Sequence, residues 1–338
     1  MQYQHVYIEA LETLTPPVEV TTASLEKMLS PLVRRIGLKP GVIEALTGVR
    51  ARRLWSDGMR PSEAAAQVCR DLLQRHPAPP CGVQALVSTS VSKDYIEPPI
   101  ASLVAGDLGV GEDCHNFDVG HACLGFVTGL TMVGNMIELG QIECGIVVAG
   151  EGSREVTQAT IRRLSAPGVD FRQFAEELAT LTLGSMAVAA LVVHERHATK
   201  GHKVLGGVTK AATHHSRLCL GTRTEMRTDA ATLLRAGVDL AEVTMGAVQR
   251  ELEFDRSEIR EFVLHQVGKA NHDAIRDRFA LPEERALRLY VDNGNVGAAG
   301  VPFTLATAAQ QGRLRAGDKA LLMGIGSGLN CAMMGVQW

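Results

Sequence analysis

Cys123 lies in the stretch FDVGHACLGF (117–126), where a β-branched run passes into a long apolar segment rich in glycine. That segment predicts a buried helix, and a cysteine at its start would lie among unpaired backbone N–H groups that favour an anion. A thiolate would be stabilised there and the thiol pKa lowered, as in a nucleophilic cysteine. A small buried hydrophobic side chain is the other interpretation, since most free cysteines have that role.

Two further side chains and one glycine-rich segment could complete such a site. His265 ends the strand-like run FVLHQ, and Asn295 lies within DNGNVGAAG. A histidine at a strand end is more often an ordinary polar residue, and Asn295 could simply cap a helix or shape a turn. The GIGSG segment at 324–328 could present backbone N–H groups to an oxyanion or form a plain glycine turn.

A cysteine with histidine and asparagine donors suits acyl transfer from a thioester. The thiolate attacks the carbonyl while backbone N–H groups hold the developing oxyanion. His265 and Asn295, as donors toward one point, would then stabilise the enolate oxygen of a second substrate. We expect no metal and no redox cofactor, because no step of this chemistry calls for one.

Short β-branched runs alternate with helix-like segments, which predicts an α/β fold whose mostly parallel sheet is covered on both faces. The expected strands are 84–91, 115–119, 144–149, 187–193, 204–210, 260–265, 287–291 and 319–324. The expected helices are 23–36, 61–75, 123–139, 171–181, 229–252, 269–279 and 301–311.

The two halves of the chain resemble each other. LVSTSVSK aligns with FVLHQVGK, and residues 118–153 follow the same order of strand end, apolar helix, glycine, turn and strand as residues 292–327. Aligning the glycines that follow the two apolar helices places Cys123 opposite Asn295 without a gap. This pattern predicts an internal duplication about a pseudo-twofold axis, with both residues at equivalent ends of two central helices.

The duplication predicts two α/β halves. The N-terminal half, 1–195, would carry the nucleophile, the loop of Glu97 and a cap insertion at 155–183. The C-terminal half, 196–338, would carry the histidine, the asparagine and the glycine-rich oxyanion loop.

The composition excludes several classes of protein. The chain has 338 residues, a net charge of −3 and no long basic run, which argues against nucleic-acid binding. An 18-residue apolar stretch and a signal-peptide core are both absent from the sequence, so we expect no transmembrane segment. The seven cysteines are scattered without zinc-type spacing, which favours reduced thiols and a cytoplasmic location.

The motifs HACLGF, HQVGKAN, GNVGAAG and GIGSG, in this order, resemble the thiolase-superfamily condensing enzymes of the β-ketoacyl-ACP synthase III branch. The resemblance runs over essentially the whole chain. It implies the five-layered αβαβα thiolase fold with its internal pseudo-twofold duplication, and an intimate homodimer. It also implies Cys123 as the acylated nucleophile, with His265 and Asn295 as the oxyanion hole of the enolate.

The segments ARRLW, TSVSKDYIEPPIAS, GGVTKAATHHSRLCLG and GIGSGLNC are similar to the acyl-CoA condensing branch that begins long-chain olefin biosynthesis. This similarity implies a head-to-head, non-decarboxylative Claisen condensation of two fatty acyl-CoAs to a 2-alkyl-3-keto acid. Coenzyme A thioesters would be the substrates, without a cofactor, and downstream olefin-pathway enzymes are candidate partners. The backbone N–H of Ser327 would form the other oxyanion hole together with that of Cys123.

Glu97, within DYIEPP, distinguishes two kinds of condensing enzyme. A malonyl donor makes its carbanion by losing CO2, whereas an unactivated acyl-CoA must lose an α-proton to a base. The resemblance implies that Glu97 reaches into the neighbouring subunit's site as this base. The two prolines predict an extended loop suited to crossing an interface, although a solvated carboxylate is the ordinary role of a loop glutamate.

Two positions depart from the family pattern. His121 replaces a small or amide residue and could alter the base or the thiolate pKa, and Gly300 stands where serine is common and could alter helix packing.

Three further functions would fit the same residues. A synthase III-like enzyme would use a malonyl or β-ketoacyl donor, and pyrone-forming enzymes are included in this group. A thioester hydrolase would release free fatty acid. A catalytically silent partner subunit would bind acyl chains without reacting with them.

Overall fold

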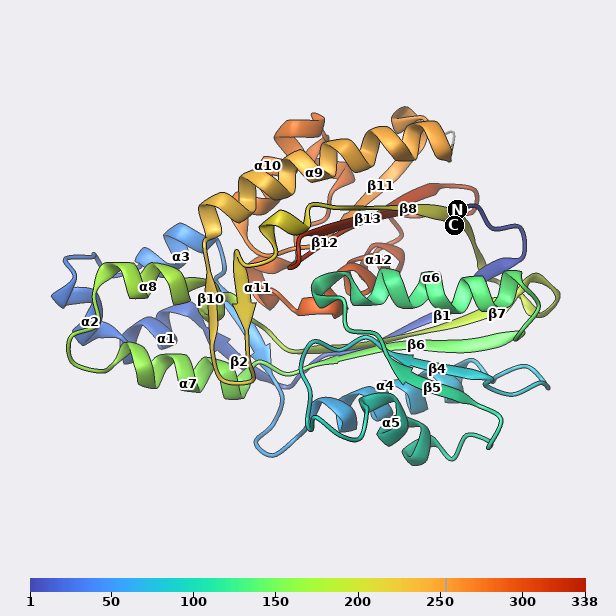
Figure 1. Cartoon of the computed structure of the whole chain (residues 1–338), viewed down its shortest axis with the longest axis horizontal. Helices are drawn as coiled ribbons and strands as arrows, with labels where there is room; N and C mark the ends of the chain where they lie inside the picture. The colour runs from blue at the N-terminus through green and yellow to red at the C-terminus, as the bar shows by residue number, and fades with distance from the viewer. Residues whose placement is uncertain (253) are drawn as a thin grey trace.

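The main sheet runs through the whole molecule. In the computed structural model, which describes residues 1–252 and 254–338, nine strands form one sheet in the order β11-β12-β13-β8-β1-β7-β6-β4-β5 (Figure 1). These strands are β1 (Val6–Leu14), β4 (Ala85–Ser88), β5 (His115–Asp118), β6 (Cys144–Glu151), β7 (Met186–His194), β8 (His202–Ala211), β11 (Ile259–Leu264), β12 (Lys319–Gly326) and β13 (Asn330–Gln337).

The two halves of this sheet repeat one topology. In the first half β4 lies parallel to β6, and β6, β7 and β1 follow as antiparallel neighbours. In the second half β11 lies parallel to β12, and β12, β13 and β8 follow in the same antiparallel sense. A short pairing of β1 with β8 joins the halves. This repeated order supports the predicted halves, 1–195 and 196–338, whose boundary stays a prediction.

Helices cover the sheet in three layers (Figure 1). Between the halves lie α6 (Gly125–Glu138) and α12 (Gly300–Gln310), whose apolar side chains share one core with strands of both halves. The outer face of the first half is covered by α4 (Pro61–Arg75) and α5 (Ile100–Leu108), and that of the second by α9 (Ala230–Glu251) and α10 (Lys269–Phe279). The result is the five-layered αβαβα thiolase fold.

The glycines of α6 allow it to lie against the sheet. A Cβ at Gly129 would lie 2.7 Å from side-chain atoms of Thr89 and Val147, and one at Gly125 would lie 2.6 Å from the Thr89 carbonyl oxygen. The close approach is therefore to the first half of the sheet at β6 and the end of β4. The lost backbone entropy, about 1 kcal/mol per glycine relative to alanine, is offset by this packing.

A separate group of helices forms one end of the molecule (Figure 1). It comprises α1 (Thr22–Met28), α2 (Ser30–Arg35), α3 (Val42–Thr47), α7 (Arg154–Leu164) and α8 (Phe171–Glu177). The last four share an apolar core with Leu29, which directly follows α1. Two small sheets pair β2 (Val18–Thr21) with β3 (Ala51–Leu54) and β9 (Cys219–Gly221) with β10 (Met226–Thr228). The cap insertion predicted at 155–183 contributes α7 and α8 to this group. Within the described ranges, no helix combines the length and the apolarity needed to cross a membrane.

The prediction of a mostly parallel sheet is wrong, since five of the eight neighbouring strand pairs are antiparallel. Pairs such as β12 and β13 are joined by a short turn that reverses the chain, which makes them antiparallel. Two predicted elements are wrong as well. The strand expected at 287–291 is instead a loop that enters the short helix α11 (Tyr290–Asn293), because the Gln266 side chain accepts the backbone N–H groups of Leu289 and Tyr290. The helix expected at 23–36 is two helices that meet at Leu29, since the second has proline in its first turn.

Candidate active site

Cys123 lies on a tight turn that precedes the central helix. It is the middle residue of the 3₁₀ turn η1 (Ala122–Leu124), directly before α6. Ala122 has φ of +46°, a left-handed conformation that costs a non-glycine residue about 1–3 kcal/mol. A Cβ at Gly326 would lie 3.3 Å from the Cys123 backbone nitrogen. The glycine-rich end of β12 therefore lies directly against the turn that carries the cysteine.

The predicted lowering of the Cys123 pKa is wrong for the free protein. Burial raises the pKa of the thiol to about 12, and the nearby Glu151 and Cys219 add to the rise. Desolvation in the buried turn is the largest cause of the rise. The thiol of Cys123 is therefore protonated at neutral pH in the free protein.

The alkylation rate of Cys123 should rise with pH throughout the neutral and mildly alkaline range. Below its pKa the thiolate fraction increases tenfold per pH unit, so iodoacetamide should react about tenfold faster for each unit. Mass spectrometry of the Cys123 peptide after timed alkylation measures this rate. A plateau below about pH 9 would contradict the raised pKa, with N-acetylcysteine as the reference thiol.

His121 is held by the central helix. Its Nδ1 lies 2.7 Å from the Thr128 hydroxyl of α6, and burial lowers the pKa of its imidazole. The ring is therefore neutral at pH 7 and supplies no positive charge that would stabilise a Cys123 thiolate.

His265 lies directly after β11, at the edge of the sheet. Its backbone N–H donates to the Met323 carbonyl of β12 (2.8 Å), and its side chain is buried. Burial lowers the pKa of the imidazole to about 4, so the ring is neutral at pH 7. Its Nδ1 has no hydrogen-bond partner among the described residues. A Cβ at Gly300 would lie 3.3 Å from that atom, so the glycine leaves room for the ring.

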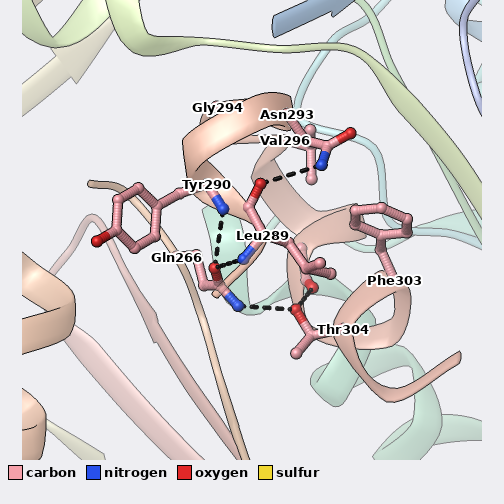
Figure 2. A pocket seen from close by; sticks show the side chains of 9 residues that line it. Gln266, Leu289, Tyr290, Asn293, Gly294, Val296, Phe303 and Thr304 are labelled. Atoms are coloured by element: carbon pink, nitrogen blue, oxygen red, sulfur yellow. Dashed lines mark hydrogen bonds between the residues drawn. The ribbon is translucent and has the colours of Figure 1, made fainter. Parts of the chain in front are cut away.

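Gln266 anchors the backbone beside His265 (Figure 2). Its Oε1 accepts the N–H groups of Leu289 (2.7 Å) and Tyr290 (3.0 Å), and its Nε2 donates to the Thr304 hydroxyl of α12 (3.2 Å). These residues line a cavity of about 10 Å³, which is at the lower limit for one water molecule. Gln266 is a positioning residue that sequence reasoning missed, and its only signal is its place directly after the histidine.

Asn295 has one amide atom already engaged. Its Oδ1 accepts the Gly297 N–H (3.0 Å), while its backbone N–H donates to Thr182 (2.9 Å) and its carbonyl accepts from Gly184 (2.8 Å). Since only an acceptor can face the Gly297 N–H, the Nδ2 group is the end left to donate. The turn η7 (Gly297–Ala299) that follows Asn295 packs against η1 and β6, and η1 packs against β12. The structure thus brings the elements of Cys123, His265 and Asn295 together.

Glu151, at the end of β6, links these elements. Its Oε1 accepts the N–H groups of Val91 (2.9 Å) and Ala298 (3.1 Å), and its Oε2 accepts the N–H (3.0 Å) and hydroxyl (2.8 Å) of Ser92. Burial raises the pKa of this carboxyl, and these hydrogen bonds oppose the rise. Sequence reasoning missed this role, although Glu151 lies near the end of the repeat at 118–153.

Replacing Glu151 by alanine should destabilise the protein. The buried N–H of Ala298 and the part-buried N–H groups of Val91 and Ser92 would lose their acceptor. We expect the free energy of unfolding to fall by about 3 kcal/mol or more. Urea unfolding followed by circular dichroism measures the change. The control, Glu242→Ala, removes a carboxylate on the exposed face of α9 and should leave the unfolding midpoint nearly unchanged.

Ser327 lies in the turn between β12 and β13 and is half-buried. Its N–H and that of Cys123 donate to no carbonyl or carboxylate of the residues that the structure describes. Gly326 directly precedes Ser327 in the chain and lies against the η1 turn that carries Cys123. Both N–H groups are therefore free to donate to a ligand.

Glu97 is not brought into the site of its own chain. It lies exposed in the loop between β4 and α5, which bends at 96–98 rather than running extended as predicted. The loop begins at Val91 and Ser92, which bind Glu151, so its base lies at the site. Its tip carries Ile96, which is 98% exposed.

Comparison with known proteins identifies the class. Residues 250–338 match the family described as 3-oxoacyl-[acyl-carrier-protein (ACP)] synthase III C terminal. A crystal structure of Xanthomonas campestris OleA matches with a TM-score of 0.97 and 37% sequence identity, covering 100% of each chain. The fold and this match place the chain among the thiolase-superfamily enzymes related to β-ketoacyl-ACP synthase III.

The whole chain also has close relatives. It is 37% identical to the acyl-CoA:acyl-CoA alkyltransferase of Xanthomonas campestris pv. campestris and 35% identical to that of Shewanella oneidensis, with 100% of each chain covered in both cases. The chain belongs to the acyl-CoA:acyl-CoA alkyltransferase (OleA) family.

Solved structures of the Xanthomonas enzyme include variants with a substituted cysteine, histidine or glutamate. The intervals along the chain between those three residues equal the intervals between Glu97, Cys123 and His265 here. The structures of the cysteine-to-serine variant hold lauric acid and lauroyl-CoA, and another structure of that enzyme holds cerulenin.

Proposed function

We propose that this protein condenses two long-chain fatty acyl-CoAs head to head, without decarboxylation, through an acyl-Cys123 intermediate. The observation that carries the proposal is the arrangement of Cys123 beside two free backbone N–H groups, with a neutral His265 and a donor Asn295 on adjoining elements. Membership of the alkyltransferase family and the matching intervals to Glu97, Cys123 and His265 support it.

The first step acylates the cysteine. The Cys123 sulfur attacks the thioester carbonyl, its proton passes to the neutral imidazole of His265, and the oxyanion accepts the N–H groups of Cys123 and Ser327. The carbon–sulfur bond to coenzyme A then breaks, and the leaving thiolate takes the proton from His265. Because the thiol has a high pKa, this proton transfer is required at neutral pH.

The second step forms the carbon–carbon bond. The carboxylate of Glu97, contributed by the second subunit, removes an α-proton from the second acyl-CoA. His265 and the Asn295 Nδ2 group donate to the enolate oxygen, and the enolate carbon attacks the acyl carbonyl. Cys123 leaves as a thiolate, which gains a proton while Glu97 loses the α-proton, so that both groups return to their starting state. Hydrolysis of the resulting 2-alkyl-3-ketoacyl-CoA by water gives the keto acid and coenzyme A.

A homodimer is part of this proposal because Glu97 needs a second chain. The loop that carries it exposes Ile96 almost completely and leaves Val91 and Tyr95 exposed as well. A second copy that covered this loop would bury these side chains and seal the second substrate from water.

The seven free cysteines support a reducing compartment, for which we propose the cytoplasm. We propose that coenzyme A thioesters are the substrates and that the reaction needs no cofactor.

The deciding experiment supplies a long-chain acyl-CoA as the sole substrate. Release of coenzyme A with a keto acid of twice the chain length, identified by mass spectrometry, is the expected result. Coenzyme A release that requires a malonyl or β-ketoacyl donor would replace this function with that of a synthase III-like enzyme. Free fatty acid as the main product would indicate a hydrolase, and an unmodified Cys123 would indicate a silent acyl-binding subunit.

A further inference from the structure

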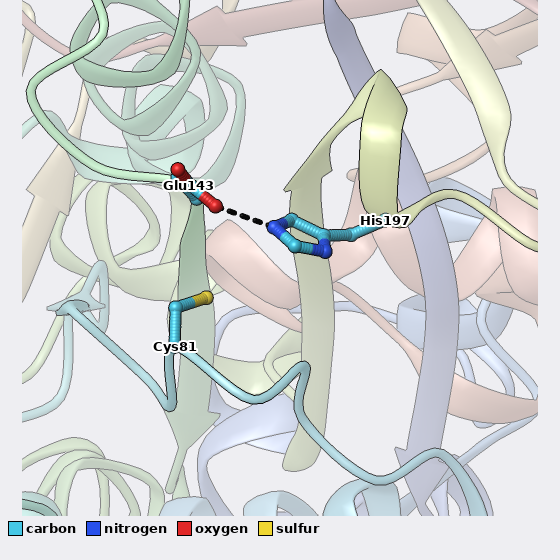
Figure 3. Close-up of side chains that lie close together, drawn as sticks. All are labelled: Cys81, Glu143 and His197. Atoms are coloured by element: carbon cyan, nitrogen blue, oxygen red, sulfur yellow. Dashed lines mark hydrogen bonds and ion pairs between the residues drawn. The ribbon is translucent and has the colours of Figure 1, made fainter.

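Three side chains that could bind a metal meet on the first half of the molecule, away from the candidate active site. Cys81 lies in the connection from α4 to β4, Glu143 directly precedes β6, and His197 lies in the 3₁₀ turn η3 (Glu195–His197) after β7 (Figure 3). One ligand atom from each lies within 4.8 Å of the other two. They come from three connections that meet at the same end of the neighbouring strands β4, β6 and β7.

The backbone holds these connections together. The Gln84 side chain accepts the Glu143 N–H (2.7 Å), and the Gln84 N–H donates to the Cys144 carbonyl (3.0 Å). The His194 N–H donates to the Glu143 carbonyl (2.8 Å), which ties β7 to the same point. Only side-chain rotations are therefore needed to bring the three ligands around one ion.

The two carboxylate oxygens of Glu143 contact different side chains. Its Oε2 lies 2.5 Å from the His197 Nε2, and its Oε1 lies 3.1 Å from the Arg196 guanidinium. An ion between Oε2 and Nε2 would replace the hydrogen bond between those atoms, with His197 as a neutral imidazole that carries its single proton on Nδ1. The Arg196 contact to Oε1 could remain and would orient the carboxylate.

Thiolate, imidazole and carboxylate together suit a borderline divalent ion. Zinc binds sulfur at about 2.3 Å and nitrogen or oxygen at about 2.0–2.1 Å, so tetrahedral ligands lie ~3.3–3.8 Å apart. The separations here, which are within 4.8 Å, need to change by about 1.5 Å at most. Ions that prefer only oxygen ligands, such as Mg²⁺ and Ca²⁺, do not match this set.

We propose that Cys81, Glu143 and His197 form a Zn²⁺ site with a water molecule as the fourth ligand. Binding transfers the Cys81 thiol proton to solvent, and the imidazole of His197 keeps its one proton on Nδ1. The ion would crosslink the three connections that precede β4, precede β6 and follow β7. It would lie at the far end of α6 from Cys123, and a helix of 14 residues is about 21 Å long, so it takes no part in condensation.

Cobalt(II) provides the test because a thiolate ligand gives it an absorption band in the near ultraviolet. The full chain, carrying Cys123→Ala to remove the active-site thiol, is stripped with a chelator and titrated with Co²⁺. We expect the thiolate band at one ion per chain and its loss when Zn²⁺ is added. Adding Cys81→Ser should remove the band, and His197→Gln should weaken binding at least about tenfold.

The matched control is Cys219→Ser in the same background, which removes a half-buried thiol elsewhere and should leave the band unchanged. Absence of the band in the Cys123→Ala protein would overturn the proposal. Its persistence in Cys81→Ser, or its loss in the control, would also do so by placing the ion elsewhere. The condensation assay is independent, since Cys81→Ser alone should condense acyl-CoA at the normal rate.

Discussion

The Cys123→Ala protein should form no acyl adduct and no keto acid. Removing the nucleophile deletes the only group that can hold the first acyl chain covalently, and we expect condensation to fall by a factor of about 10⁴ or more. Intact-mass spectrometry after incubation with acyl-CoA measures the adduct, and coenzyme A release measures turnover. The alanine is smaller than cysteine and should be tolerated in the η1 turn, so a folded protein is expected.

Cys81→Ser is the matched control for this experiment because it removes an exposed thiol at the other end of α6. It should acylate and condense as the unmodified protein does. An acyl adduct that survives Cys123→Ala would show that another residue is the nucleophile, and the proposed mechanism would then be wrong.

Glu97→Gln should separate the two half-reactions. Acylation of Cys123 needs no carboxylate and should proceed normally, whereas removal of the α-proton should slow by roughly 10²–10⁴-fold. The expected result is an acyl-enzyme that accumulates, seen by mass spectrometry, with little keto acid. Glu112→Gln, which changes another exposed carboxylate of the same half, should leave both steps intact. Normal condensation by Glu97→Gln would remove Glu97 from the mechanism.

Mixed dimers test from which subunit Glu97 acts. In a heterodimer of one Cys123→Ala chain and one Glu97→Gln chain, a base supplied across the interface gives one complete site. A base that served its own chain would give no complete site. We therefore expect the co-expressed, doubly tagged heterodimer to recover condensation to about half of the normal rate, while either parent homodimer stays inactive. An inactive heterodimer would mean that Glu97 does not act in trans.

Most of the fold followed from local patterns. The alternation of strands and helices predicted the α/β class, and the internal repeat anticipated the matching strand order of the two halves. The failures came from long-range contacts. The strand expected at 287–291 does not form because Gln266, over twenty residues earlier, takes its backbone donors. The central placement of β1 likewise depends on its pairing with β7 and β8 rather than on its own composition.

The sequence by itself determined which residues belong to the candidate site, because order, spacing and the repeat pointed to Cys123, His265 and Asn295. Only the tertiary structure decided their protonation states and neighbours. Burial makes Cys123 a thiol and His265 a neutral imidazole, and desolvation depends on chain segments that are distant in sequence. The same reason explains why Glu151 was missed. A carboxylate becomes a link between loops only when folding brings their N–H groups to it.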